Sequence, residues 1–102
     1  MFDLKRQPTH PGAILREEFV EPLGLTQTAL ASMLKTTFRT VNEILNEKRN
    51  ISPDMALRLA RFFGTSEELW LNLQDQYDLY SARQQNKDVL RSIKPFKQAV
   101  GY

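Results

Sequence analysis

Apolar residues recur three and four positions apart along nearly the whole chain, and this spacing limits the fold more than any other feature of the sequence. Such a period places apolar side chains on one face of an α-helix. No segment alternates apolar and polar residues for long enough to form a β-strand. A chain of 102 residues supports one modest hydrophobic core. We therefore predict an all-α fold around a single core.

Residues that favour helix ends divide the chain into five predicted helices. The first runs over residues 11–20, with a proline in its first turn. Thr26 is suited to cap a short second helix, and Thr37 caps a third after a tight break over residues 35–37. The apolar positions that we expect these helices to bury are Ile14, Leu15, Phe19, Leu30, Ala31, Leu34, Val41, Ile44 and Leu45.

The fourth and fifth helices have clear boundaries in the sequence. Ser52 caps the fourth helix, and Gly64 fits the left-handed position that ends it. Thr65 and Glu68 form a capping box for the fifth helix, with Ser66 as a competing cap. We expect the fourth helix to present a wide apolar face, made of Ala56, Leu57, Leu59, Ala60, Phe62 and Phe63.

Charge is distributed unevenly along the chain. The net charge is +2, but residues 81–102 hold five basic residues and one acidic residue, a net charge of +4, which leaves −2 on residues 1–80. Beyond Ala82 large apolar residues become sparse, so we expect the last helix to fray into a basic tail. This pattern predicts a main domain over residues 1–82 and a basic C-terminal extension over residues 83–102. The extension keeps spaced apolar residues at Val89, Leu90, Ile93, Phe96 and Val100.

The segment over residues 26–46 carries the pattern most informative about function. A two-turn helix, a break of three or four residues and a second helix with a polar outer face match the helix-turn-helix, in which the second helix enters the major groove of double-stranded DNA. The main domain is not broadly basic, so DNA binding would depend on a local cluster. Lys35, Arg39, Lys48 and Arg49 supply that cluster, against Glu43 and Glu47.

Position in the motif assigns a role to each candidate DNA contact. Gln27 and Thr37 begin the two helices, where side chains and free backbone N–H groups can bind phosphate. Arg39 is the strongest candidate for base readout, because arginine pairs bidentately with guanine. Thr40, Asn42 and Glu43 share its face, and Lys48 and Arg49 follow the helix as phosphate contacts. The predicted DNA-binding residues are Gln27, Thr37, Phe38, Arg39, Thr40, Asn42, Glu43, Lys48 and Arg49.

Each of these residues also has an ordinary structural interpretation. Arg39 and Glu43 are four residues apart and are suited to a surface ion pair. Gln27 and Asn42 are equally suited to be solvated polar residues, and only their joint placement favours a DNA contact. Phe38 can pack inward, contact a thymine methyl group or stay exposed, and of these we favour inward packing.

The fifth predicted helix carries more large apolar residues than a small core needs. A single short recognition helix also reads too few base pairs to be selective, so a homodimer is expected. We predict that this helix forms the dimer interface, through Leu69, Trp70, Leu73, Tyr77 and Tyr80.

Several classes of function lack the residues they require. The chain has no cysteine, which excludes disulfides and thiolate metal sites. His10 is the only histidine, and we expect it to cap or support the helix start at Pro11 rather than to bind a metal or act in catalysis. The adjacent pairs Glu17–Glu18 and Glu67–Glu68 point in different directions on their helices and do not form an acid–base couple. We predict a cytoplasmic, non-enzymatic protein with no cofactor, metal or membrane segment.

Two stretches of the sequence resemble the HigA family of antitoxins, within the larger group of lambda-repressor-like helix-turn-helix domains. The first stretch covers residues 10–27 (HPGAILREEFVEPLGLTQ). The second covers residues 51–66 (ISPDMALRLARFFGTS) and continues with Leu69–Gln74. The resemblance implies a five-helix domain, a homodimer, a palindromic operator in the promoter of its own module, and neutralisation of a partner ribonuclease toxin.

The chain departs from the family pattern inside the DNA-binding motif. Lys35 and Glu47 stand where the family usually has glycine, Thr36 where a small apolar residue is usual, and Phe38 where an arginine is usual. An unchanged turn would hold Lys35 at a positive φ, at a cost of about 1 kcal/mol or more. Two alternatives stand beside the antitoxin interpretation. One is a stand-alone repressor of the same fold without a toxin partner, which the sequence of this chain alone does not exclude. The other is a helical protein–protein adaptor that has lost DNA binding, which the altered turn and the net charge of −2 on residues 1–80 make possible.

Overall fold

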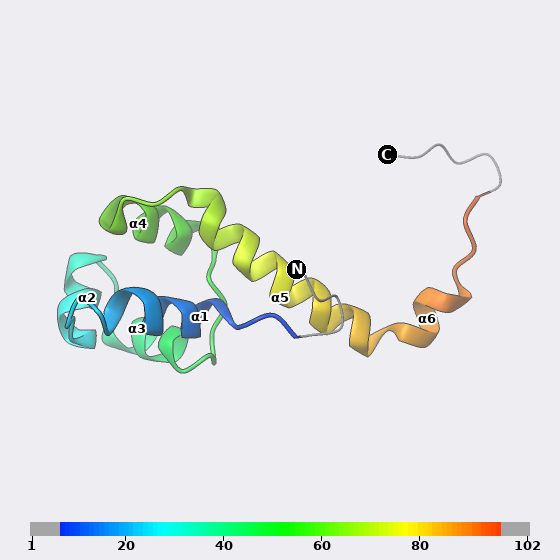
Figure 1. Cartoon of the computed structure of the whole chain (residues 1–102), viewed down its shortest axis with the longest axis horizontal. Helices are drawn as coiled ribbons and strands as arrows, with labels where there is room; N and C mark the ends of the chain where they lie inside the picture. The colour runs from blue at the N-terminus through cyan, green and yellow to red at the C-terminus, as the bar shows by residue number, and fades with distance from the viewer. Residues whose placement is uncertain (1–6, 97–102) are drawn as a thin grey trace.

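The computed structural model describes residues 7–96, and within this range the chain is helical without any β-strand (Figure 1). The all-α prediction is therefore confirmed. The first helical stretch divides into α1 and η1. Two short helices, α2 and α3, follow, and α4, α5 and α6 complete the described part. The elements are α1 (Pro11–Ile14), η1 (Leu15–Val20), α2 (Gln27–Met33), α3 (Phe38–Leu45), α4 (Pro53–Phe63), α5 (Glu67–Gln85) and α6 (Lys87–Ser92).

Most of the predicted helix ends are confirmed. The hydroxyls of Thr26, Thr37 and Ser52 each accept a hydrogen bond from the backbone N–H three residues later, at 3.0–3.1 Å. Gly64 ends α4 in the left-handed conformation, with φ +73°. These caps satisfy N–H and C=O groups that a helix end leaves without a partner, which is why they can be predicted locally.

The start of α5 differs from the predicted capping box. Ser66 is the cap, since its hydroxyl accepts from the Leu69 N–H at 3.1 Å. The hydroxyl of Thr65 accepts instead from the indole Nε1 of Trp70, at 2.8 Å. Trp70 is completely buried, and a buried indole N–H needs an acceptor, so Thr65 serves the core rather than the helix end.

The C-terminal part is more helical than predicted. Instead of fraying beyond Ala82, α5 continues to Gln85, and α6 follows after a break at Asn86. Arginine and glutamine are good helix formers even on a fully solvated helix, which explains why the rise in charge does not end α5. The predicted domain boundary between residues 82 and 83 therefore lies inside a helix.

The core lies where α1, η1, α2, α3 and α4 meet the first turns of α5. Its largest buried side chains are Leu15, Leu30, Ile44, Leu59 and Trp70. α5 begins against α4, contacts α1 and continues outward, with α6 at its far end (Figure 1). α1 and α2 contact α3 on the side that buries Val41, Ile44 and Leu45, and the side that carries Arg39 is exposed.

Candidate nucleic-acid interface

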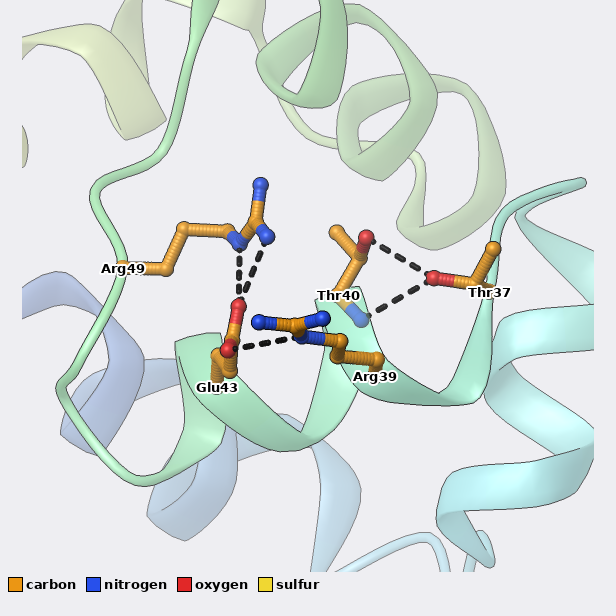
Figure 2. Close-up of polar contacts among 5 residues, drawn as sticks. All are labelled: Thr37, Arg39, Thr40, Glu43 and Arg49. Atoms are coloured by element: carbon orange, nitrogen blue, oxygen red, sulfur yellow. Dashed lines mark hydrogen bonds and ion pairs between the residues drawn. The ribbon is translucent and has the colours of Figure 1, made fainter.

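The outer face of α3 carries polar side chains whose positions are set by the helix start. The Thr37 hydroxyl accepts from the Thr40 backbone N–H at 3.1 Å and lies 2.9 Å from the Thr40 hydroxyl (Figure 2). Two residues into the helix, the side chain of Arg39 is 83% exposed. The structure therefore places Thr37, Arg39 and Thr40 together at one end of an open helix face, as the sequence predicts.

Glu43 connects two of the predicted cationic contacts. Its Oε2 accepts from Arg39 Nε at 3.1 Å, and its Oε1 accepts from Arg49 Nε at 2.9 Å and Nη2 at 2.6 Å (Figure 2). The hydrogen bonds from Arg49 and then from Arg39 lower the pKa of the Glu43 carboxyl below its usual value. The ordinary Arg39–Glu43 ion pair is thus present, as part of a bridge that the sequence did not predict.

Gln27 and Asn42 bind one another. Asn42 Nδ2 donates to Gln27 Oε1 at 2.9 Å, across 15 residues of sequence. This bond ties the first turn of α2 to the middle of α3, and both side chains are half-buried. The two residues meet at the junction of the motif, and their bond uses the side-chain oxygen of Gln27 rather than its Nε2 group.

Phe38 is not packed inward, so that prediction is wrong. The side chain is 52% exposed at the first position of α3. Helical side chains lean toward the N-terminal end of their helix, so a ring at the first position leans past the helix end instead of onto the core. Lys48 and Arg49 are also exposed, on the connection that leaves α3.

Both helices of the motif end in the same backbone arrangement. Lys35 follows α2 at φ 59°, and Glu47 follows α3 at φ 62°. In each case the next residue donates back across a full turn: Thr36 N to Ala31 O at 3.0 Å, and Lys48 N to Glu43 O at 2.8 Å. This is the Schellman arrangement, in which the left-handed position usually holds glycine. The turn is therefore retained, and the predicted positive φ at Lys35 is confirmed.

Two arginines from other helices support these helix ends. Arg58 of α4 donates from Nη1 to Leu34 O at 2.9 Å and to Lys35 O at 2.7 Å, and its Nε binds Asp54. Arg16 of η1 donates to the carbonyl of Leu45 at the end of α3. Neither contact is predictable from the sequence, because hydrogen bonds over 24 and 29 residues leave no local pattern.

The back of α3 is fixed by the start of α1. A Cβ at Gly12 would lie 1.8 Å from the carbonyl oxygen of Ile44, so only glycine allows this approach. His10 caps α1, with Nδ1 accepting from the Gly12 N–H at 2.9 Å, which confirms its predicted structural role. Burial lowers the pKa of His10, against smaller opposing effects of Glu47 and Asp78. Its ring meets that of Tyr77 edge-on at 4.8 Å.

The predicted dimer residues occupy different environments on α5. Trp70 is 0% exposed and lies inside the core of its own chain, which leaves it no surface for a partner. Leu69 is exposed, whereas Leu73, Tyr77 and Tyr80 are half-buried. The structure adds Leu79, which is 51% exposed on the same helix. The described residues contain no cluster of metal-binding side chains and no helix long and apolar enough to cross a membrane.

Comparison with known proteins agrees with this geometry. The Helix-turn-helix family model matches residues 15–70. The virulence-associated protein I of Dichelobacter nodosus is 48% identical over 80 residues, which cover 78% of this chain and 74% of that protein.

Solved structures give a second line of comparison. The Pseudomonas aeruginosa antitoxin HigA, solved with the higBA promoter, superposes with a TM-score of 0.84 at 47% identity, over 87% of this chain and 98% of that one. The antitoxin GraA in complex with its operator superposes with a TM-score of 0.84 at 43% identity, over 94% and 98%. The chain thus belongs to the helix-turn-helix family and, within it, to the HigA-type antitoxins.

Proposed function

We propose that this protein is an antitoxin that binds an operator in its own promoter and represses it. The observation that carries the proposal is the open face of α3, which presents Arg39 beside a Thr37–Thr40 cap while the rest of the helix is fixed from behind. Two similar proteins, HigA and GraA, were solved with a promoter and an operator, respectively. In this proposal α3 enters the major groove.

The geometry refines the predicted roles of the contact residues. Arg39 keeps its terminal nitrogens for a guanine edge, and the exposed ring of Phe38 is suited to a thymine methyl group. Gln27 holds Asn42 with its oxygen and offers Nε2 to a phosphate. Lys48 adds a phosphate contact that does not depend on base sequence.

Titration of labelled duplexes tests the DNA-binding part. One duplex carries the region upstream of the gene, and a second has the same base composition in shuffled order. We expect tighter binding to the upstream duplex, with a logarithmic affinity that falls linearly with the logarithm of salt concentration. Equal, salt-independent affinity for both duplexes would contradict the proposal and favour the adaptor alternative.

A palindromic operator requires two copies of the protein, so the proposal includes a homodimer. The half-sites would then lie about one helical turn, roughly 34 Å, apart, or a multiple of that spacing. Leu69 and Leu79 give α5 exposed apolar side chains outside the core, which supports a role for this helix in the interface.

The second part of the proposal is direct binding of a ribonuclease toxin, which rests on membership of the HigA-type antitoxins. The extension over residues 83–102 is compatible with it, because Val89, Leu90, Ile93 and Phe96 are all exposed. Val100, also predicted as an anchor, lies outside the described residues. A segment with spaced exposed apolar residues is typical of one that packs on a partner. A solvated arm or a dimer arm is an equally good interpretation of the same segment.

Co-expression with the product of the adjacent gene tests toxin binding. The full chain should restore growth and co-purify with that product. A chain cut after Ala82 removes the extension; failure to rescue would place the toxin contact there, and rescue would move it to the remaining helices. If the full chain neither rescues nor co-purifies but still prefers the upstream duplex, the protein is a stand-alone repressor.

A further inference from the structure

We propose that Glu43 determines DNA specificity by positioning Arg39 for base readout while restraining Arg49 from indiscriminate phosphate contacts. This inference rests on the proposed function, since it concerns how α3 distinguishes its operator from other DNA. Glu43 acts through its neighbours, so it is a positioning residue that need not touch a base itself.

The bridge leaves the reading edge of Arg39 open. Only Nε of Arg39 binds Glu43, at 3.1 Å, and the side chain is 83% exposed (Figure 2). A guanidinium has four further N–H donors on its two terminal nitrogens. Those nitrogens are the pair that donates to O6 and N7 of guanine. Glu43 therefore restricts the orientation of Arg39 before DNA binds, which lowers the entropy lost on forming the base contact.

Glu43 occupies the binding edge of Arg49, whereas it leaves that of Arg39 open. Both its Nε and its Nη2 donate to the same oxygen, Oε1 of Glu43, at 2.9 and 2.6 Å. A phosphate that recruits this edge of Arg49 must displace the carboxylate, and the carboxylate itself repels phosphate. Generic DNA offers no base contact that compensates for this loss, so Glu43 disfavours non-operator sequences more than the operator.

The bridge also links two segments of the chain. Arg39 and Glu43 lie one turn apart on α3, whereas Arg49 lies on the connection between α3 and α4. One carboxylate therefore couples the residue proposed to read a base with a residue proposed to follow the backbone. Removal of the negative charge should affect these two contacts in opposite directions.

The variant Glu43→Gln tests this coupling, with Glu47→Gln as the matched control. Glu47 is an exposed acid that follows α3, and its ion-pair partner is Arg16, at 3.7 Å, rather than either bridged arginine. Affinity for the upstream and shuffled duplexes is measured at two salt concentrations. We expect Glu43→Gln to bind the operator more weakly and the shuffled duplex more tightly, a loss of discrimination on the order of tenfold. Glu47→Gln should tighten binding to both duplexes alike.

A double-mutant cycle separates positioning from a structural effect. In an Arg39→Ala background, Glu43→Gln should no longer weaken operator binding, because the residue it positions is gone. Melting temperatures should change little, since exposed ion pairs contribute little to stability. Equal shifts for both duplexes, or an unchanged effect in the Arg39→Ala background, would overturn the inference. If the wild type itself shows no preference for the upstream duplex, the proposed function fails instead.

Discussion

Arg58 of α4 donates from Nη1 to the carbonyl oxygen of Lys35 at 2.7 Å, and so supports from outside a turn in which Lys35 holds a left-handed conformation, at φ 59°. The same nitrogen binds Leu34 O, so both carbonyls at the end of α2 have a partner. The position of α3 relative to α2 depends on this turn. Tertiary contacts thus stabilise a backbone conformation that the residue itself disfavours.

We therefore expect Lys35→Gly to stabilise the protein. Glycine adopts a positive φ without the steric cost of a Cβ, so the free energy of unfolding should rise by about 1 kcal/mol. Lys35→Ala is the control, because it removes the charge but keeps the Cβ, and it should leave stability almost unchanged. Urea denaturation measures both. An equal gain from both variants would show that charge, not backbone conformation, sets the stability of the turn.

Gly12 should tolerate no larger residue, because of a close contact and not because of its backbone conformation. The Cβ of alanine would lie 1.8 Å from Ile44 O, so α1 and α3 would have to separate. Overpacking of this kind costs about 1–3 kcal/mol or more. Gly24 is the control, because its φ is +64° but nothing lies within 4 Å of an added Cβ. Thermal unfolding should show a larger loss for Gly12→Ala than for Gly24→Ala, and the reverse order would contradict the close approach.

These residues show which parts of the structure the sequence can predict. The caps at Thr26, Thr37 and Ser52 depend on groups three residues away, so their patterns are local and could be recognised. Arg58 and Lys35 are 23 residues apart, and their contact exists only after the chain has folded back and brought α4 to the turn that follows α2.

The candidate site likewise has a part that the sequence predicts and a part that depends on contacts between distant segments. Arg39, Thr40 and Glu43 were assigned to one face because helical spacing dictates it. The Asn42–Gln27 bond and the Arg49–Glu43 bond were not predicted, because each joins α3 to another segment. Phe38 is exposed instead of packed inward because its ring, at the first position of α3, leans past the helix end and has no surface to cover.

His10 should make stability depend on pH. Its pKa is lowered from 6.5 in the folded state by burial, and its Nδ1 must be unprotonated to accept from the Gly12 N–H. The unfolded chain therefore binds a proton more readily than the folded one. The stabilising contribution is fully present above about pH 6.5 and is lost as pH falls through the lower, folded pKa.

The variant His10→Asn isolates this effect. The asparagine side-chain oxygen can accept the same capping bond but does not titrate in this range. The free energy of unfolding is measured at about pH 7.5 and about pH 5.5, on either side of the usual histidine pKa. Between the higher and the lower pH it should fall for the wild type and fall less for the variant. The pKa of Glu43 is lowered from 4.5, so its loss of stabilisation belongs to a more acidic range. Identical pH dependence in both proteins would contradict the assignment to His10.

The proposed dimer interface predicts a specific difference between two leucines. Leu79 of α5 and Leu57 of α4 are each 51% exposed, so either can accept a charged side chain without disturbing the core. Leu57 was expected on the apolar face of its helix, and its exposure makes it a matched control. Light scattering of the wild type should give twice the chain mass of 11.9 kDa. Leu79→Glu should shift the protein toward monomer, and Leu57→Glu should not. A monomeric wild type, or equal effects of the two variants, would remove α5 as the interface.

Arg39 and Lys48 should differ in how their loss affects DNA binding. Arg39 projects from the second position of α3 with its terminal nitrogens uncommitted, whereas Lys48 is exposed beyond the helix end, where we propose that it contacts the flanking DNA backbone. Arg39→Ala should weaken operator binding by about 1–3 kcal/mol and relax the preference at a single base pair. Lys48→Ala should weaken binding to all sequences and reduce the salt slope by about one, because one phosphate contact is lost. Competition with a set of operators mutated at each base pair, repeated over a salt series, distinguishes the two effects. If Arg39→Ala retains the wild-type preference at every base pair, the open face of α3 does not read the operator through this residue.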